Sequence, residues 1–256
     1  MIIAGIDAGV ETIKAVIMKD GKVVGRGKAP SGGVDRPEQA RQAYEAALKE
    51  AGVGEGDVEA VIATGKGKFD VPFAGGRVTD TVAAAYAARF LYPDATSVMG
   101  VGADETLAAA LGDKRLISEF VVNQKCTAGL GTFLTYLAKR LGMTIEETGA
   151  EAKDAGPINE GCVVFSELDA LSLLNNGAEP KAVMASAVKA VAVRAANVMN
   201  DLTVRSVERT VLIGGLTKNK VFVRLLEELL GFSFIIPEDA EFCGAVGAAV
   251  SGGKVS

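Results

Sequence analysis

The hydrophobic and polar positions along the chain predict short strands followed by helices, and this order occurs twice. The opening segment, MIIAGIDAGVETIKAVIMKDGKVVGRGKA, alternates apolar runs with glycine turns, which is typical of strands joined by tight hairpins. One strand is predicted to end near Asp7, a second to cover residues 13–18, and the pair Asp20-Gly21 to turn the chain into a third. The chain therefore begins with a predicted β-meander.

Helical periodicity follows this meander. Apolar residues in 37–51 recur every three or four positions, as on one face of a helix. The stretch VEAVIATG is predicted as a short buried strand, and TDTVAAAYAARFLY as a helix with Thr79 as its N-cap. The pattern breaks near Pro93, so residues 1–94 are predicted to form a first lobe.

The second half begins again with a β-meander. Its predicted strands are TSVMGVGAD, residues 107–111 and RLISEFVV, with a turn at Gly112-Asp113. Helices then dominate residues 131–202. The two halves share this architecture without residue-level identity.

The remainder of the chain alternates strands and helices. RTVLIGG is predicted as a strand, 219–230 as a helix, FSFIIP as a strand, and the small residues from Ala240 onward as a last helix. The second lobe is predicted to cover 95–239. We expect the final helix, 240–256, to pack back on the first lobe.

Composition places the chain among globular proteins. Its 256 residues are 49% hydrophobic and include 31 glycines, and no apolar run approaches the roughly 20 residues of a membrane span. A predicted strand starts at the N-terminus with no basic region or cleavage site before it, so we expect no secretory signal and a cytoplasmic protein. A net charge of −5 without a basic tract argues against a nucleic-acid surface.

The absence of histidine limits the available chemistry. Histidine is the usual general base and a common zinc ligand, and the chain has none, so acid–base work falls to carboxylates, lysine or water. The three cysteines, Cys126, Cys162 and Cys243, are too few and too scattered for a disulfide framework. They are therefore interpreted as buried thiols, reactive thiols or metal ligands.

Glycine turns in both meanders suit a nucleotide held between the lobes. Glycine lets backbone N–H groups approach a phosphate, and a nearby cation offsets the phosphate charge. Asp7-Ala8-Gly9 with Lys14 supplies this pattern in the first lobe, and Gly100-Val101-Gly102 supplies the turn in the second. Asp7 is also suited to position Mg²⁺ through water. On spacing alone, ordinary hairpin turns are the more frequent explanation.

Another glycine-containing stretch, ATGKGKF, covers residues 63–69. It lacks the spacing of a Walker loop and has no Ser or Thr after the lysine. We interpret it as a solvated basic loop.

Cys126 and Cys162 differ from Cys243 in their setting. Each lies at a break where a helix is about to begin, before TAGLG and VVFSELDA respectively, and Ser166 and Asp169 have capping-box-like spacing. A helix N-terminus favours a thiolate. Two thiolates are half of the ligands of a cubane cluster, so a second chain across a two-fold axis would complete the set. Inert buried thiols are the alternative, and Cys243, among small residues, is predicted to be structural.

Five motifs, in order along nearly the whole chain, carry a family resemblance. GIDAGVETIKAVIMKDG, NQKCTAGLGTF, GCVVFSELDALSLLNNG, VLIGGLTKN and CGAVGAA resemble the ATPase activators of 2-hydroxyacyl-CoA dehydratases and the related ATPase subunits of benzoyl-CoA reductases. The resemblance implies the α/β, two-lobed actin, sugar kinase and heat-shock chaperone fold (ribonuclease H-like), with lobes built as a β-meander plus αβαβα. It also implies ATP or ADP with Mg²⁺ in the cleft and a 4Fe-4S cluster shared between two protomers.

The same resemblance assigns roles to residues. Cys126 and Cys162 match the cluster ligands, and Asp104 and Glu105 are candidate catalytic carboxylates. The nucleotide contacts fall on the first phosphate turn, the second phosphate turn and the adenosine motif, in the order Asp7, Gly9, Val10, Glu11, Thr12, Lys14, then Gly102, Ala103, then Gly214, Gly215.

Each of the two phosphate turns departs from the activator pattern. Val10-Glu11 stands where the activators usually carry Ser-Thr, and Gly100 stands where the second turn usually begins with aspartate. Asp104 and Glu105 are then available to orient water, and VGADE is more similar to the benzoyl-CoA reductase subunits. Because those reductases pair two different ATPase subunits, one protomer of a heterodimer would tolerate a weakened site.

The resemblance therefore predicts an ATP-dependent electron-transfer subunit. A ferredoxin-type donor loads the cluster, ATP changes the angle between the lobes, and the electron passes to the subunits of a CoA-ester reductase or a 2-hydroxyacyl-CoA dehydratase. The expected partners also include a second ATPase protomer, identical or homologous, and exclude nucleic acid and membrane. Two alternatives share the fold: a small-molecule kinase, which needs no paired thiols, and a catalytically weak nucleotide-binding subunit.

Overall fold

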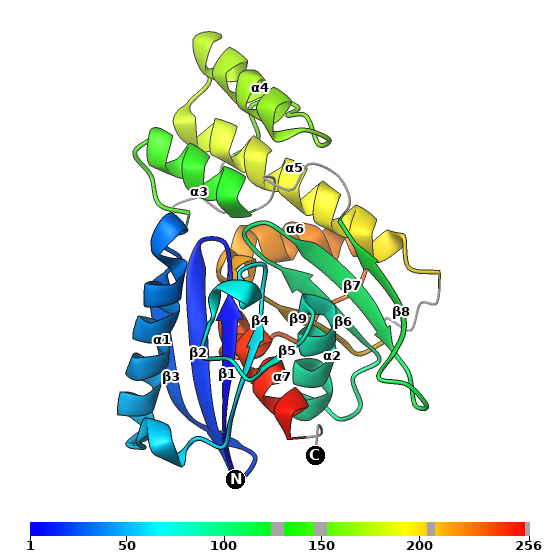
Figure 1. Ribbon diagram of the computed structural model, residues 1–256. Helices are drawn as coiled ribbons and strands as arrows, with labels where there is room; N and C mark the ends of the chain where they lie inside the picture. The colour runs from blue at the N-terminus through cyan, green and yellow to red at the C-terminus, as the bar shows by residue number, and fades with distance from the viewer. Residues whose placement is uncertain (124–130, 146–152, 204–207, 254–256) are drawn as a thin grey trace.

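The computed structural model describes residues 1–123, 131–145, 153–203 and 208–253, and these contain two sheets that share the same four-stranded topology, with β5 added at the edge of the first (Figure 1). The first sheet has the order β3-β2-β1-β4-β5 and contains β1 (Ile2–Ala8), β2 (Thr12–Lys19), β3 (Lys22–Pro30), β4 (Ala60–Thr64) and β5 (Gly76–Arg77). The second has the order β8-β7-β6-β9 and contains β6 (Ser97–Val101), β7 (Thr106–Leu111), β8 (Ile117–Val122) and β9 (Thr210–Ile213).

Each sheet combines an antiparallel meander with a parallel strand. In the first, β1 pairs antiparallel with β2 and parallel with β4; in the second, β6 pairs antiparallel with β7 and parallel with β9. Parallel strands need a crossover connection, and the helical segments supply it in both halves. The predicted duplication of the β-meander is confirmed.

Two helices cover the first sheet, and a third lies between it and the second sheet. Helix α1 (Arg36–Ala51) packs on β2 and β3, while α7 (Cys243–Gly252) packs on β1, β2 and β4 (Figure 1). Helix α2 (Asp80–Leu91) lies against α7 and also contacts β6 and β7 of the second sheet. The Thr79 hydroxyl accepts a hydrogen bond from the Val82 N–H at 3.4 Å, so the predicted N-cap is confirmed. The α2–α7 pair therefore lies between the two sheets.

The second sheet is covered by a helical layer. This layer contains α3 (Gly131–Arg140), α4 (Val163–Asn175), α5 (Pro180–Asn200) and α6 (Lys220–Leu230). Within the described residues, α5 alone is long and apolar enough to cross a membrane, yet 78% of its most apolar window is buried in the fold. It packs against α3, α4, α6 and β7, so burial in the core accounts for its apolar sequence.

Short 3₁₀ helices complete the connections. They are η1 (Gly33–Asp35), η2 (Glu55–Asp57), η3 (Lys68–Asp70), η4 (Gly215–Lys218) and η5 (Ala240–Phe242). The predicted strand in FSFIIP is wrong, because only Ile235 forms an isolated bridge, to Val211. Phe232 and Phe234 pack instead against the helical core of the second lobe, so their burial produced the strand-like pattern.

Candidate functional site

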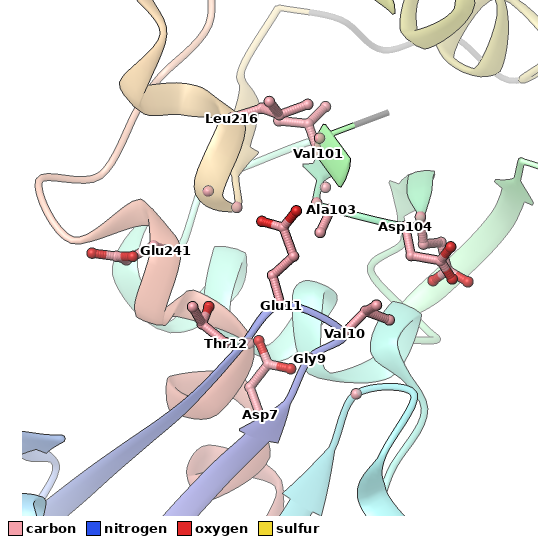
Figure 2. A pocket seen from close by; sticks show the side chains of 18 of the residues that line it. Asp7, Gly9, Val10, Glu11, Thr12, Val101, Ala103, Asp104, Leu216 and Glu241 are labelled. Atoms are coloured by element: carbon pink, nitrogen blue, oxygen red, sulfur yellow. The ribbon is translucent and has the colours of Figure 1, made fainter. Parts of the chain in front are cut away.

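A cleft of about 340 Å³ lies between the two sheets, and both glycine turns line it (Figure 2). The structure brings together every residue predicted to contact nucleotide or to act in catalysis: Asp7, Gly9, Val10, Glu11, Thr12, Lys14, Gly102, Ala103, Asp104, Glu105, Gly214 and Gly215. Their common location gives one continuous wall from the first turn to the adenosine motif.

The first turn positions a carboxylate and a cation on the floor of the cleft. Asp7 and Lys14 are register partners in the β1–β2 hairpin, so their side chains share one face of the sheet. A Cβ on Gly9 would lie 2.7 Å from the Thr12 carbonyl oxygen, and the turn therefore requires glycine at this position. Glu11 points from the turn toward the second lobe (Figure 2), where its carboxylate accepts a 3.5 Å hydrogen bond from the Thr135 hydroxyl.

The environment of Asp7 suits a bound cation. Its pKa is raised to about 6: burial is the main cause, the charge of Lys14 opposes the rise, and the charge of Asp80 adds to it. A carboxylate that is costly to ionise in this cleft gains from a divalent cation, which favours the charged form. Asp7 therefore fits the role of a magnesium-positioning group.

The second turn is closed by its own backbone and supported by α3. The Gly102 N–H donates to the Glu105 carbonyl at 3.0 Å. The first residues of α3 pack on the same turn, since Gly131 N–H donates to the Gly102 carbonyl at 3.3 Å and Thr132 N–H to the Ala103 carbonyl at 3.0 Å. Burial raises the pKa of Asp104, and the charge of Lys66 opposes that rise.

The predicted adenosine motif, Gly214-Gly215, lies where β9 ends. Gly214 has φ +107°, and its N–H donates to the Ala240 carbonyl at 2.8 Å. The Thr217 hydroxyl donates a hydrogen bond to the Gly214 carbonyl at 2.7 Å. Leu216 and Ile145 add apolar surface to this end of the cleft, which suits the flat, largely apolar face of a nucleobase.

Two polar residues beside Asp7 were missed from the sequence. Asp80 is the first residue of α2, directly after the predicted cap, and it lines the cleft beside Asp7. Thr64, the register partner of Asp7 on β4, has a buried hydroxyl with no hydrogen-bond partner among the described residues. The position of Asp80 at a helix start was a usable signal, whereas no local pattern marks Thr64.

A second missed group lines the cleft and joins the lobes. Glu241 in η5 forms ion pairs with Lys28 on β3, at 2.7 Å, and with Lys218 in η4. Burial opposes ionisation of Glu241, but hydrogen bonds from Lys218 and Lys28 outweigh it and lower the pKa of the carboxyl. The three residues come from separate parts of the sequence, so only the fold brings them together.

The cysteines occupy different environments. Cys162 is the N-cap residue of α4, and its N–H and that of Gly161 donate to the Asn159 side-chain oxygen at 2.8 and 2.9 Å. Asn159, rather than Ser166, organises this helix start, since the Ser166 hydroxyl instead donates to the Asn159 and Cys162 carbonyls. Cys126 lies outside the described residues. Cys243 is 1% exposed, and burial raises the pKa of its thiol to about 12.

The whole chain, rather than the cleft alone, decides the family. Residues 4–252 match the BadF/BadG/BcrA/BcrD ATPase family. The chain belongs to this ATPase family. The activator of lactoyl-CoA dehydratase from Anaerotignum propionicum is 32% identical over 255 residues, covering 96% of this chain and 95% of that protein.

Solved structures identify the fold of this ATPase-family chain. The activator of the 2-hydroxyisocaproyl-CoA dehydratase from Clostridium difficile, with bound ADPNP, has a TM-score of 0.85 and 25% identity, covering 100% of this chain and 98% of that chain. A ROK family glucokinase from Streptomyces griseus shares the fold alone, with a TM-score of 0.61 and 14% identity over 97% and 98% of the two chains. The predicted two-lobed, sugar kinase-like fold is confirmed, and membership of the family implies binding of ATP and Mg²⁺.

Proposed function

We propose that this protein is the ATP-dependent electron-transfer subunit of a CoA-ester reductase or 2-hydroxyacyl-CoA dehydratase system. One observation carries the proposal: two glycine turns face each other across a cleft that contains Asp7 and Lys14, in a chain that matches an ATPase family over residues 4–252. ATP or ADP with Mg²⁺ occupies this cleft.

Different residues of the chain are assigned to different parts of the nucleotide. Asp7 would hold the Mg²⁺, Lys14 would offset phosphate charge, and the turn residues Gly9 to Thr12 would offer backbone donors. Across the cleft, Gly102 and Ala103 hold the outer phosphates while Asp104 and Glu105 orient the attacking water. Gly214 and Gly215 let the adenosine lie close to the backbone.

The start of α4 fits one ligand of a shared cluster. Cys162 occupies the N-cap position of the helix, where the N-terminal end of the dipole favours a thiolate. Beside it, α4 exposes Val164, Phe165 and Leu168, with exposed fractions between 55% and 62%. A second protomer, identical or homologous, covers these side chains in the proposed assembly and supplies the remaining thiolates.

Cys126 and Cys162 of each protomer would hold a 4Fe-4S cluster, which would supply one-electron transfer at a potential set by charge, hydrogen bonding and exposure. The chain would contribute a conformational change that alters the charge, hydrogen bonding and exposure around the cluster. The α2–α7 pair contacts both sheets, so a nucleotide that draws the two turns together biases the angle between the lobes. A ferredoxin-type donor and the partner reductase or dehydratase complete the proposed cytoplasmic system.

Anaerobic purification tests the cluster. We expect a brown protein with one 4Fe-4S cluster per two ATPase protomers, measured as iron and sulfide. Cys126→Ser and Cys162→Ser should each abolish the cluster. Cys243→Ser is the matched control, because this buried thiol packs in the core between α2 and the second sheet. Iron lost in the Cys243 variant but kept in the other two contradicts the ligand assignment.

A further inference from the structure

Lys66 lies between the two phosphate turns, where the sequence predicted only a solvated loop. It lines the cleft and forms an ion pair with Glu105 of the opposite lobe. We propose that Lys66 senses the terminal phosphate: it binds Glu105 when that phosphate is absent and transfers to it when a nucleoside triphosphate enters. This inference rests on the proposed nucleotide site and adds selection between triphosphate and diphosphate.

The loop that carries Lys66 is packed against the first turn. The Gly67 N–H donates to the Ala8 carbonyl at 2.9 Å. Gly65 has φ +88°, and a Cβ there would lie 2.6 Å from the Ala8 carbonyl oxygen and 2.7 Å from an Asp7 carboxylate oxygen. No larger residue fits at that position, so the backbone fixes the base of the Lys66 side chain beside Asp7.

The other end of the Lys66 side chain reaches across the cleft. Its ammonium donates to a Glu105 carboxylate oxygen, and Glu105 belongs to the turn that Gly102 closes. Burial lowers the pKa of Lys66, but Glu105, together with Asp80 and Asp104, raises it by more. Lys66 therefore stays cationic and holds a candidate water-orienting carboxylate.

A terminal phosphate competes well for this cation. The Lys66 side chain is 44% exposed and that of Glu105 is 18% exposed, so water reaches the ammonium group and weakens the pair by screening. A phosphate carries more charge than a carboxylate and forms strong charge-assisted hydrogen bonds with an ammonium group. ADP lacks the terminal phosphate, so the pair with Glu105 persists in the diphosphate complex. The transfer also frees Glu105 at the moment when water must be oriented.

Lys68 of the same loop provides the matched control. Its ammonium donates to the Gly65 carbonyl at 3.2 Å and lies 5.4 Å from the centre of the Phe69 ring. These contacts keep it on its own lobe. Lys68→Met removes the same charge from the same loop without touching the bridge between the turns.

Binding of ADP and of a non-hydrolysable ATP analogue, each with Mg²⁺, tests the proposal by calorimetry on the full chain. Lys66→Met should weaken binding of the analogue about tenfold or more and change the affinity for ADP less than twofold. Lys66→Arg should keep most of the preference for the analogue over ADP. Lys68→Met should preserve the ratio of the two affinities. Retained ADP binding also shows that each variant is folded.

A double-mutant cycle separates competition from simple repulsion. Glu105→Gln should tighten binding of the analogue severalfold in the wild-type background and have little effect on it in the Lys66→Met background. An unchanged analogue-to-ADP ratio in Lys66→Met, or a Glu105→Gln gain that persists without Lys66, overturns the proposal. If the wild type binds neither nucleotide, the proposed nucleotide site itself is wrong, which is a different result.

Discussion

The β1–β2 and β6–β7 hairpins have the same topology but different chemistry. The first pairs a partly buried carboxylate, Asp7, with the cation Lys14 on the same sheet face. The second has glycine at position 100, carries its carboxylates Asp104 and Glu105 beyond the strand, and takes its cation from the other lobe.

This difference shows how a duplicated fold divides one task. The first turn contains the groups proposed to hold a metal and its phosphate, so it should govern affinity. The second turn depends on contacts across the cleft, so it should govern hydrolysis of the bound nucleotide. The two turns are therefore expected to respond differently to equivalent substitutions.

The largest expected effect is on affinity at the first turn. Asp7→Ala removes the proposed magnesium partner, and we expect magnesium-dependent ATP binding to weaken about 100-fold, as measured by calorimetry. Asp104→Ala removes the same group from the second turn and should cost less than about fivefold, because Asp104 is not the proposed metal partner. Equal losses in the two variants would contradict the division between the turns.

A smaller effect is expected on hydrolysis at the second turn. Gly100→Asp returns a carboxylate to the cleft and should raise ATP turnover of the isolated chain about tenfold or more relative to Gly100→Asn, which has the same shape. A Cβ at this position lies 3.1 Å from Leu107 Cγ, so both variants must shift that side chain equally. Rapid turnover by the unmodified chain alone would show that Asp104 or Glu105 already suffices.

The smallest expected effect concerns pH. Because the pKa of Asp7 is about 6, a proton competes with Mg²⁺ below that pH, and affinity for magnesium nucleotide should fall about fourfold between pH 7 and pH 5.5. The folding stability of the nucleotide-free protein has the opposite pH dependence. Because the pKa of Asp7 is raised in the folded state, the Asp7 contribution to stability falls as pH rises from about 4 to about 6 and is constant above that.

Asp7→Asn serves as the control for this pH effect. The nucleotide also titrates in the same range, and the variant reports that contribution alone. The Asp7 share is the difference between the two pH profiles. Identical profiles in wild type and variant would show that Asp7 is ionised throughout the range.

The sequence predicted local features well and the cross-cleft contacts poorly. The meanders, the Thr79 cap and the family depend on residues near one another in the chain, which leave periodic or motif signals. Lys66 with Glu105 joins positions 39 apart, and Lys28 with Glu241 joins positions 213 apart. No local pattern records such pairs. The predicted strand in FSFIIP was wrong for a related reason, because burial against helices and burial in a sheet select the same apolar residues.

Helix α7 packs on β1, so the last described helix completes the lobe that the first strand begins. Ile3, Val16 and Ile62 share a buried cluster with Ala245 and Ala249. At a synthesis rate of about 5–20 residues per second, roughly 10 to 50 seconds pass before α7 is made and can pack on these apolar side chains. The emerging first lobe exposes that surface throughout, and a ribosome that stalls before residue 243 leaves it open to chaperones or to aggregation.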